Sequence, residues 1–142
     1  MKNARINVIT LGVKDVQRSR KFYEDLGFLA SSASNEHFVA FQTSGIVFCL
    51  YPITLLADDA SVDSNGSGFR GLTVSINVGR KEEVQEILEE AKKCGAAVIK
   101  EAQDVFWGGH SGYFADPDGH LWEIAWNPHW LLKESGLIEL PK

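Results

Sequence analysis

Glu123 is the residue of this 142-residue chain whose type and surroundings are best suited to chemistry. A carboxylate can act as a general base or as a metal ligand, and each role needs a second group close by. His120 lies three residues before Glu123 on a predicted strand, so the two side chains point to opposite faces. If Glu123 is buried without a metal it needs a hydrogen-bond donor, and the sequence shows no evident second catalytic group.

A glycine-rich segment, Trp107-Gly-Gly-His110-Ser-Gly112, precedes Glu123. It does not fit a phosphate-binding loop, because no helix is predicted to follow it. As a loop residue, His110 either reaches into a cavity or lies on the surface, and both interpretations stay open. His37 and His129 have no convergent partners in the sequence.

The composition excludes several classes of protein. The chain is 44% hydrophobic and 23% charged, as expected of a globular domain, and its net charge is −5. It has no basic stripe for nucleic acid and no run of about 18 apolar residues for a membrane helix. Cys49 and Cys94 are too few for a disulfide scaffold or a thiolate zinc site. We therefore expect a cytoplasmic protein that binds neither nucleic acid nor membrane.

The first half of the chain predicts a strand, a helix and three more strands. Asp15 suits the N-cap of the helix and Gly27 its C-terminal turn. The elements are expected at 6–13 (strand), 15–26 (helix), and 28–34, 37–43 and 45–51 (strands).

The second half repeats this order. Asp116-Pro-Asp-Gly119 predicts a tight turn between its last two strands, with Pro and Gly at the positions that such turns favour. The elements are expected at 72–78 (strand), 81–94 (helix), and 96–101, 111–115 and 120–126 (strands).

The two halves predict one domain over residues 4–128, because about 70 residues rarely fold stably alone. It comprises module one (4–51), a linker or mobile loop (52–71) and module two (72–128). The tail, 129–142, has the apolar spacing of a short packed helix or of a segment that contacts a second copy, and we favour simple packing on its own domain.

Two stretches, Val8–Asp15 continuing into Ser19–Phe28, and Gly112–Pro128, resemble the vicinal oxygen chelate superfamily. This superfamily includes glyoxalase I, bleomycin resistance proteins and extradiol dioxygenases. The resemblance implies an α+β fold of two tandem β-α-β-β-β modules that form curled mixed sheets around a cavity. It also implies a homodimer.

In this superfamily a His on the first strand and a Glu on the last strand of a module typically bind a divalent ion. The resemblance places these positions on Val8, Cys49, Thr73 and Glu123. Only Glu123 keeps the usual ligand type; Cys49 could join it in an altered site, but two ligands are too few. We therefore predict no metal and no other cofactor.

Strand alternation assigns each side chain to a face. If Glu123 lies on the concave face, the following residues lie there too: Val8, Thr10, Gly12, Val47, Cys49, Tyr51, Thr73, Ser75, Asn77, Leu121 and Ala125. The helices then cover Ile9, Leu11, Val13, Phe48, Leu50, Leu72, Val74, Ile76, Val78, Trp122, Ile124 and Trp126.

The polar concave face has two interpretations that stay open: a solvated sheet surface or a small-molecule pocket. The predicted ligand-binding residues are Cys49, Tyr51, Thr73, Ser75, Asn77, Trp107, His110, Tyr113 and Glu123. Aromatic walls from Phe38, Phe41, Tyr51, Trp107 and Tyr113 would favour a planar ligand.

Three functions follow from these observations. The first is a metal-independent small-molecule binding protein, whose ligand the sequence does not name. The second is a lyase or dioxygenase-type enzyme with an altered metal site or with Glu123 as general base. The third is an interaction module whose cavity has lost its ligand.

Overall fold

The computed structural model describes residues 5–141, so the predicted boundaries at residues 4 and 142 lie outside the described range. The chain divides into two compact units, Met1–Gly68 (unit 1) and Phe69–Lys142 (unit 2). No helix within the described range is long and apolar enough to cross a membrane.

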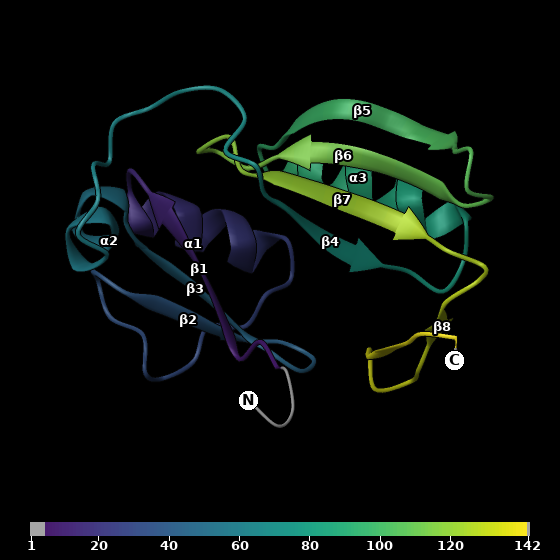
Figure 1. Ribbon diagram of the computed structural model, residues 1–142, viewed down its shortest axis with the longest axis horizontal. Helices are drawn as coiled ribbons and strands as arrows, with labels where there is room; N and C mark the ends of the chain where they lie inside the picture. Colours follow the sequence, from purple (N-terminus) through teal and green to yellow (C-terminus); the bar gives the residue numbers. More distant parts are fainter. Residues whose placement is uncertain (1–4, 142) are drawn as a thin grey trace. The chain divides into compact units, whose positions relative to one another are not determined.

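Unit 1 contains a three-stranded mixed sheet in the order β1-β3-β2 (Figure 1). The first and third strands pair in parallel, and the second is antiparallel to the third. Its elements are β1 (Val8–Val13), α1 (Val16–Asp25), β2 (Val39–Gln42), β3 (Val47–Pro52) and α2 (Ile53–Asp59).

The helix α1 begins and ends where its sequence predicts. The Oδ1 atom of Asp15 accepts a hydrogen bond from the backbone N–H of Arg18 at 3.0 Å, which satisfies one free donor of the first turn. Gly27 follows the helix with a φ of 103°, a conformation that glycine adopts without strain. The face that α1 buries includes Phe22 and Tyr23.

The core of unit 1 is aromatic. The Tyr23 ring, fully buried, contacts the rings of Phe28 and Phe48 edge-on at centroid distances of 5.5 and 4.9 Å. Phe41 stacks on Phe48 at 5.6 Å and is also fully buried. The prediction that Phe41 lines a ligand pocket is therefore wrong, because its ring belongs to this core.

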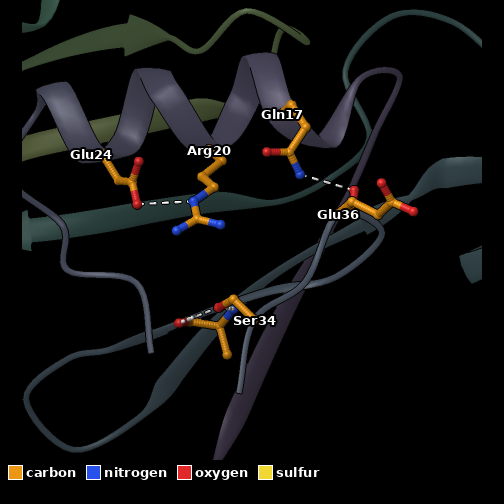
Figure 2. A network of polar contacts seen from close by, with 6 residues as sticks. Gln17, Arg20, Glu24, Ser34 and Glu36 are labelled. Atoms are coloured by element: carbon orange, nitrogen blue, oxygen red, sulfur yellow. Dashed lines mark hydrogen bonds and ion pairs between the residues drawn. The ribbon is translucent and has the colours of Figure 1, made fainter. Parts of the chain in front are cut away.

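The strand predicted at 28–34 does not form; one isolated bridge joins Ala30 to Phe41. Instead, the Ser34 hydroxyl accepts from the backbone N–H of Ala40 at 3.0 Å, and the Ser31 N–H donates to the Ala40 carbonyl at 2.8 Å. Figure 2 shows Ser34 in this contact, and Gln17 of α1 donating to the Glu36 carbonyl at 2.9 Å. Ser31 and Ser34 therefore bond the backbone C=O and N–H groups of Ala40, which a neighbouring strand would otherwise pair with.

The segment predicted as a linker at 52–71 contains a helix, α2, so the loop prediction is wrong over 53–59. Ile53 of α2 packs over Gly12 of β1, where an added Cβ would lie 2.9 Å from the Ile53 Cγ1 atom. Glycine at position 12 leaves room for the helix, which seven residues would hardly maintain alone.

Unit 2 contains a four-stranded mixed sheet in the order β4-β7-β6-β5, with α3 against one face (Figure 1). Val84, Leu88 and Ala91 form the buried face of α3. The elements are β4 (Thr73–Asn77), α3 (Glu82–Lys93), β5 (Ala97–Asp104), β6 (His110–Ala115) and β7 (Leu121–Trp126). β4 begins at Thr73, so Leu72 precedes the sheet and is 54% exposed, contrary to its predicted packing under the helix.

The predicted turn between β6 and β7 is confirmed. The Oδ1 atom of Asp116 accepts from the backbone N–H groups of Asp118 and His120 at 2.9 and 2.8 Å. Gly119 has a φ of 87° and donates its N–H to the Asp116 carbonyl. This turn sets the register of the two strands that carry the candidate site.

As far as residue 141, the C-terminal tail forms a small hairpin and no helix. β8 (Leu131–Leu132) pairs antiparallel with β9 (Ile138–Glu139). Lys133 and Glu139 form an ion pair across it at 2.5 Å. The apolar spacing predicts a helix here, but Gly136 has a φ of 80° and turns the chain back on itself instead.

Candidate functional site

A cavity of about 510 Å³ lies in unit 2, on the face of the sheet that carries Ser75 and Glu123. It opens beside β4 and β7, on the face of the sheet opposite α3. Its wall combines amide, hydroxyl, carboxylate, imidazole and indole groups, from Ser75, Asn77, Trp107, Glu123, Ala125, Asn127, His129 and Trp130. The structure therefore brings together four of the predicted residues: Ser75, Asn77, Trp107 and Glu123.

Glu123 lies in the middle of a polar row across three strands. Ser75 of β4 and Tyr113 of β6 are its register partners on either side. The Ser75 hydroxyl donates to the Oε2 atom of Glu123 at 2.9 Å. Burial, and then the negative charge of Glu123 and a hydrogen bond to it, raise the pKa of the Tyr113 hydroxyl. Tyr113 therefore stays a protonated donor beside the carboxylate.

Trp107 is held against the cavity by the glycines that follow it. The Gly108 N–H donates to the Val105 carbonyl at 3.0 Å, which closes a turn. A Cβ on Gly109 would lie 1.8 Å from the Trp107 ring and 2.6 Å from the Trp126 carbonyl oxygen. Only glycine at 109 permits this close approach, which gives the glycine-rich segment a structural reason.

Three cavity residues were missed by sequence reasoning: Asn127, His129 and Trp130. The Asn127 Oδ1 atom accepts the His129 N–H at 2.9 Å, which turns the chain as it leaves β7. The sequence signal was present, since Asn-Pro-His-Trp directly follows the last strand, but it does not say to which face the chain turns.

His110 is the first residue of β6 and not a loop residue. Strand alternation places it with Gly112, whose added Cβ would meet Leu88 of α3, on the face opposite Tyr113. Its Nδ1 atom lies 2.8 Å from the Asp104 carboxylate, to which Lys81 also donates at 2.6 Å. These two contacts hold the pKa of Asp104 below its usual value. The structure thus gives His110 a hydrogen-bond partner, Asp104, that is not part of the cavity wall.

The other predicted site residues do not line this cavity. Cys49 and Tyr51 lie in unit 1, where Cys49 is 2% exposed and burial raises the pKa of its thiol. The Tyr51 ring contacts Phe38 at 6.3 Å. Thr73 shares the face of Ser75 and is exposed, at the opposite end of β4 from Asn77.

The four positions that the resemblance assigns to metal ligands do not fit a divalent ion. Val8 is an exposed aliphatic residue, and Thr73 pairs with Leu121. Within residues 5–141, no group of three or more His, Cys, Asp or Glu side chains gathers in a way that could hold a metal. One carboxylate and one hydroxyl in unit 2 fall short of the three or four donors that such ions take.

Comparison with known proteins agrees with the fold. A sequence profile of the Glyoxalase/Bleomycin resistance protein/Dioxygenase superfamily matches residues 5–124. None of the curated proteins that were compared with the chain matches it.

Solved structures resemble the chain over most of its length. A glyoxalase-related enzyme from Fulvimarina pelagi is 32% identical, with a TM-score of 0.87, over 97% of this chain and 99% of that one. A superfamily member from Burkholderia phytofirmans is 20% identical, with a TM-score of 0.77, over 87% and 98%. A lactoylglutathione lyase from Agrobacterium tumefaciens is 19% identical, with a TM-score of 0.68, over 88% and 95%.

Proposed function

The chain belongs to the Glyoxalase/Bleomycin resistance protein/Dioxygenase superfamily, and from this we propose that unit 2 binds a small organic molecule without a divalent metal. The homodimer implied by the resemblance stays a prediction.

The cavity of unit 2 is the observation that carries the proposal. Its volume of about 510 Å³ lies within the range of small-molecule sites. Two indole side chains supply apolar wall, and the polar groups of Ser75, Asn77, Glu123, Asn127 and His129 line the same cavity. This combination is typical of a site that orients a ligand by hydrogen bonds and binds it by apolar contact.

The donor set supports metal independence. The carboxylate of Glu123 already accepts from Ser75, and its other neighbour in the row, Tyr113, is a protonated hydroxyl. The wall thus offers a single carboxylate flanked by neutral hydroxyl groups, whereas a divalent transition-metal ion usually takes three or four stronger protein donors.

A thermal-shift screen of a small-molecule library tests the binding function. We expect at least one compound to raise the melting temperature of the wild type and of Phe106→Ala. Phe106 precedes Trp107 in the sequence, but its side chain is fully exposed and is not among the residues that line the cavity, which makes it a matched control. Trp107→Ala should lose the response. A library that stabilises neither protein would contradict the proposal.

Metal analysis tests whether the protein is independent of a divalent metal. Protein purified without a tag and measured by mass spectrometry of its metal content should carry far less than one equivalent of any divalent ion. One equivalent per chain that is lost in Glu123→Ala would contradict metal independence.

A second candidate is an enzyme in which Glu123 removes a proton from a bound carbon acid. The likeness to the glyoxalase-related enzyme, at 32% identity over nearly the whole chain, favours it. The test is to incubate each compound found in the screen with the protein and follow it by NMR. A product formed by the wild type, and absent with Glu123→Gln, would support the enzyme.

A further inference from the structure

The charge of the cavity wall narrows the class of ligand, if the cavity binds one as proposed. The lining residues include one carboxylate, that of Glu123, and neither lysine nor arginine. An anionic ligand would meet this carboxylate with no lysine or arginine on the wall to offset the repulsion.

The charge of Glu123 is not balanced by the protein itself. The groups beside it, the Ser75 hydroxyl that donates to its Oε2 atom and the hydroxyl of its register partner Tyr113, are neutral and carry no charge to offset that of a carboxylate. The ion pairs among residues 5–141 do not include Glu123, so His129, although it lines the same wall, is not paired with it. A half-buried carboxylate in a cavity is most stable when a cation approaches it.

The aromatic wall favours the same kind of ligand. Trp107 and Trp130 both line the cavity. The face of an indole attracts ammonium groups more strongly than the face of any other side chain. Because Gly109 allows the Trp107 ring to pack closely against the backbone, the position of this ring is well defined.

We propose that the cavity of unit 2 binds a small organic ammonium ion that carries an aromatic or other flat apolar group. Glu123 is its counter-ion, held in place by Ser75 and Tyr113. Trp107 and Trp130 contact the ammonium group or the flat group attached to it. The inference rests on the proposed binding function and adds the charge of the ligand.

Three probes of similar size and different charge test the proposal: benzyltrimethylammonium, benzyl alcohol and benzoate. Binding to the full chain is measured by calorimetry and by tryptophan fluorescence. We expect the cation to bind at least about tenfold more tightly than the alcohol, and benzoate to bind most weakly.

Two variants locate the effect. Glu123→Gln should weaken binding of the cation about tenfold and change that of benzyl alcohol by less than about twofold. Glu101→Gln removes an exposed carboxylate of β5 and should leave both unchanged. Circular dichroism and the melting temperature show whether each variant is folded.

The outcomes separate the two proposals. If the alcohol or benzoate binds as tightly as the cation, or if Glu123→Gln and Glu101→Gln behave alike, the charge inference is overturned while the cavity remains a binding site. If none of the probes binds the wild type, the charge inference is also overturned. The binding function itself then stands or falls with the library screen.

Discussion

Units 1 and 2 place different side chains at corresponding points of the same strand pairing. In unit 1 the parallel pair β1 and β3 sets Thr10 beside Cys49, and in unit 2 the parallel pair β4 and β7 sets Ser75 beside Glu123. Cys49 is almost fully buried, whereas Glu123 is half-buried and lines a cavity. One backbone arrangement therefore supports a buried thiol in one unit and a solvent-accessible carboxylate in the other.

The cores of the two units differ as well. Unit 1 packs the rings of Tyr23, Phe28, Phe41 and Phe48 together under its sheet. Unit 2 packs mainly aliphatic residues of α3 against its sheet, with Phe114 stacked on Trp122 at 6.1 Å. Unit 2 keeps two of its indole side chains for the wall of the cavity. The same topology therefore uses aromatic residues differently in the two units. In unit 1 they form the core, and in unit 2 two of them line the cavity.

Placing the side chain of position 123 at position 49, and the reverse, should have the largest effect on the free energy of unfolding. Cys49→Glu places a carboxylate where the native side chain is 2% exposed, and we expect it to lower the free energy of unfolding by about 3–5 kcal/mol. Glu123→Cys should cost less than about 1 kcal/mol, because Ser75 is exposed and can bond water instead. Urea denaturation measures both. Equal costs would show that the two positions do not differ in environment.

A Cβ at Gly109 tests how closely the cavity wall is packed. Gly109→Ala should lower the free energy of unfolding by about 1–3 kcal/mol, because neither the Trp107 ring nor the Trp126 backbone can easily move. It should also displace Trp107 and weaken ligand binding. Gly79→Ala is the control: its Cβ would meet only Glu83, at 3.8 Å, so a change within about 0.5 kcal/mol is expected. Native stability in Gly109→Ala would refute this packing.

Alkaline pH should separate the buried thiol of unit 1 from the phenol of unit 2. Burial raises the pKa of Cys49 above its ordinary value of 9.0, so the unfolded chain loses this proton first. The stability present below pH 9.0 should then decline, by less than about 1.4 kcal/mol per pH unit. The raised pKa of Tyr113 should add a similar decline that begins one unit higher, above 10.0.

Urea denaturation as a function of pH measures this decline. Cys49→Ala should remove its first part and Tyr113→Phe its second part. Cys94→Ala serves as the control for removal of a thiol that is only half-buried. A decline that persists in Cys49→Ala would assign it to other groups.

The smallest expected effect is that of the charged residues in the last turns of α1 and α3 on the stability of the protein. In α3, acidic residues occupy the first turn and Lys92 and Lys93 the last, which complements the helix dipole. In α1, Glu24 is in the last turn and pairs with Arg20 at 2.9 Å (Figure 2). Lys93→Gln should therefore cost about 0.3–0.5 kcal/mol. Glu24→Gln should be nearly neutral, because loss of the pair is offset by removal of an acid from that end. A larger loss for Glu24→Gln in thermal unfolding would contradict this reading of the charges.

Much of the fold could be predicted from local residue patterns. Asp15 and Gly27 set the ends of α1, and Asp116 to Gly119 the turn before β7, because each effect acts within a few residues. The segment around Ser34 could not be predicted, since its hydroxyl bonds to a residue six positions away. The short helix α2 was also missed, because its contact with Gly12 crosses the sequence.

The sequence by itself determined which side chains alternate on the concave face, and so which groups were available for a site in unit 2. Tertiary structure alone decided which of them meet. The turn at Asn127 brings His129 and Trp130 to the cavity, and the position of β6 directs His110 towards Asp104 instead. Strand alternation is a local property of the chain, whereas the direction of a segment after a strand depends on contacts with residues distant in sequence.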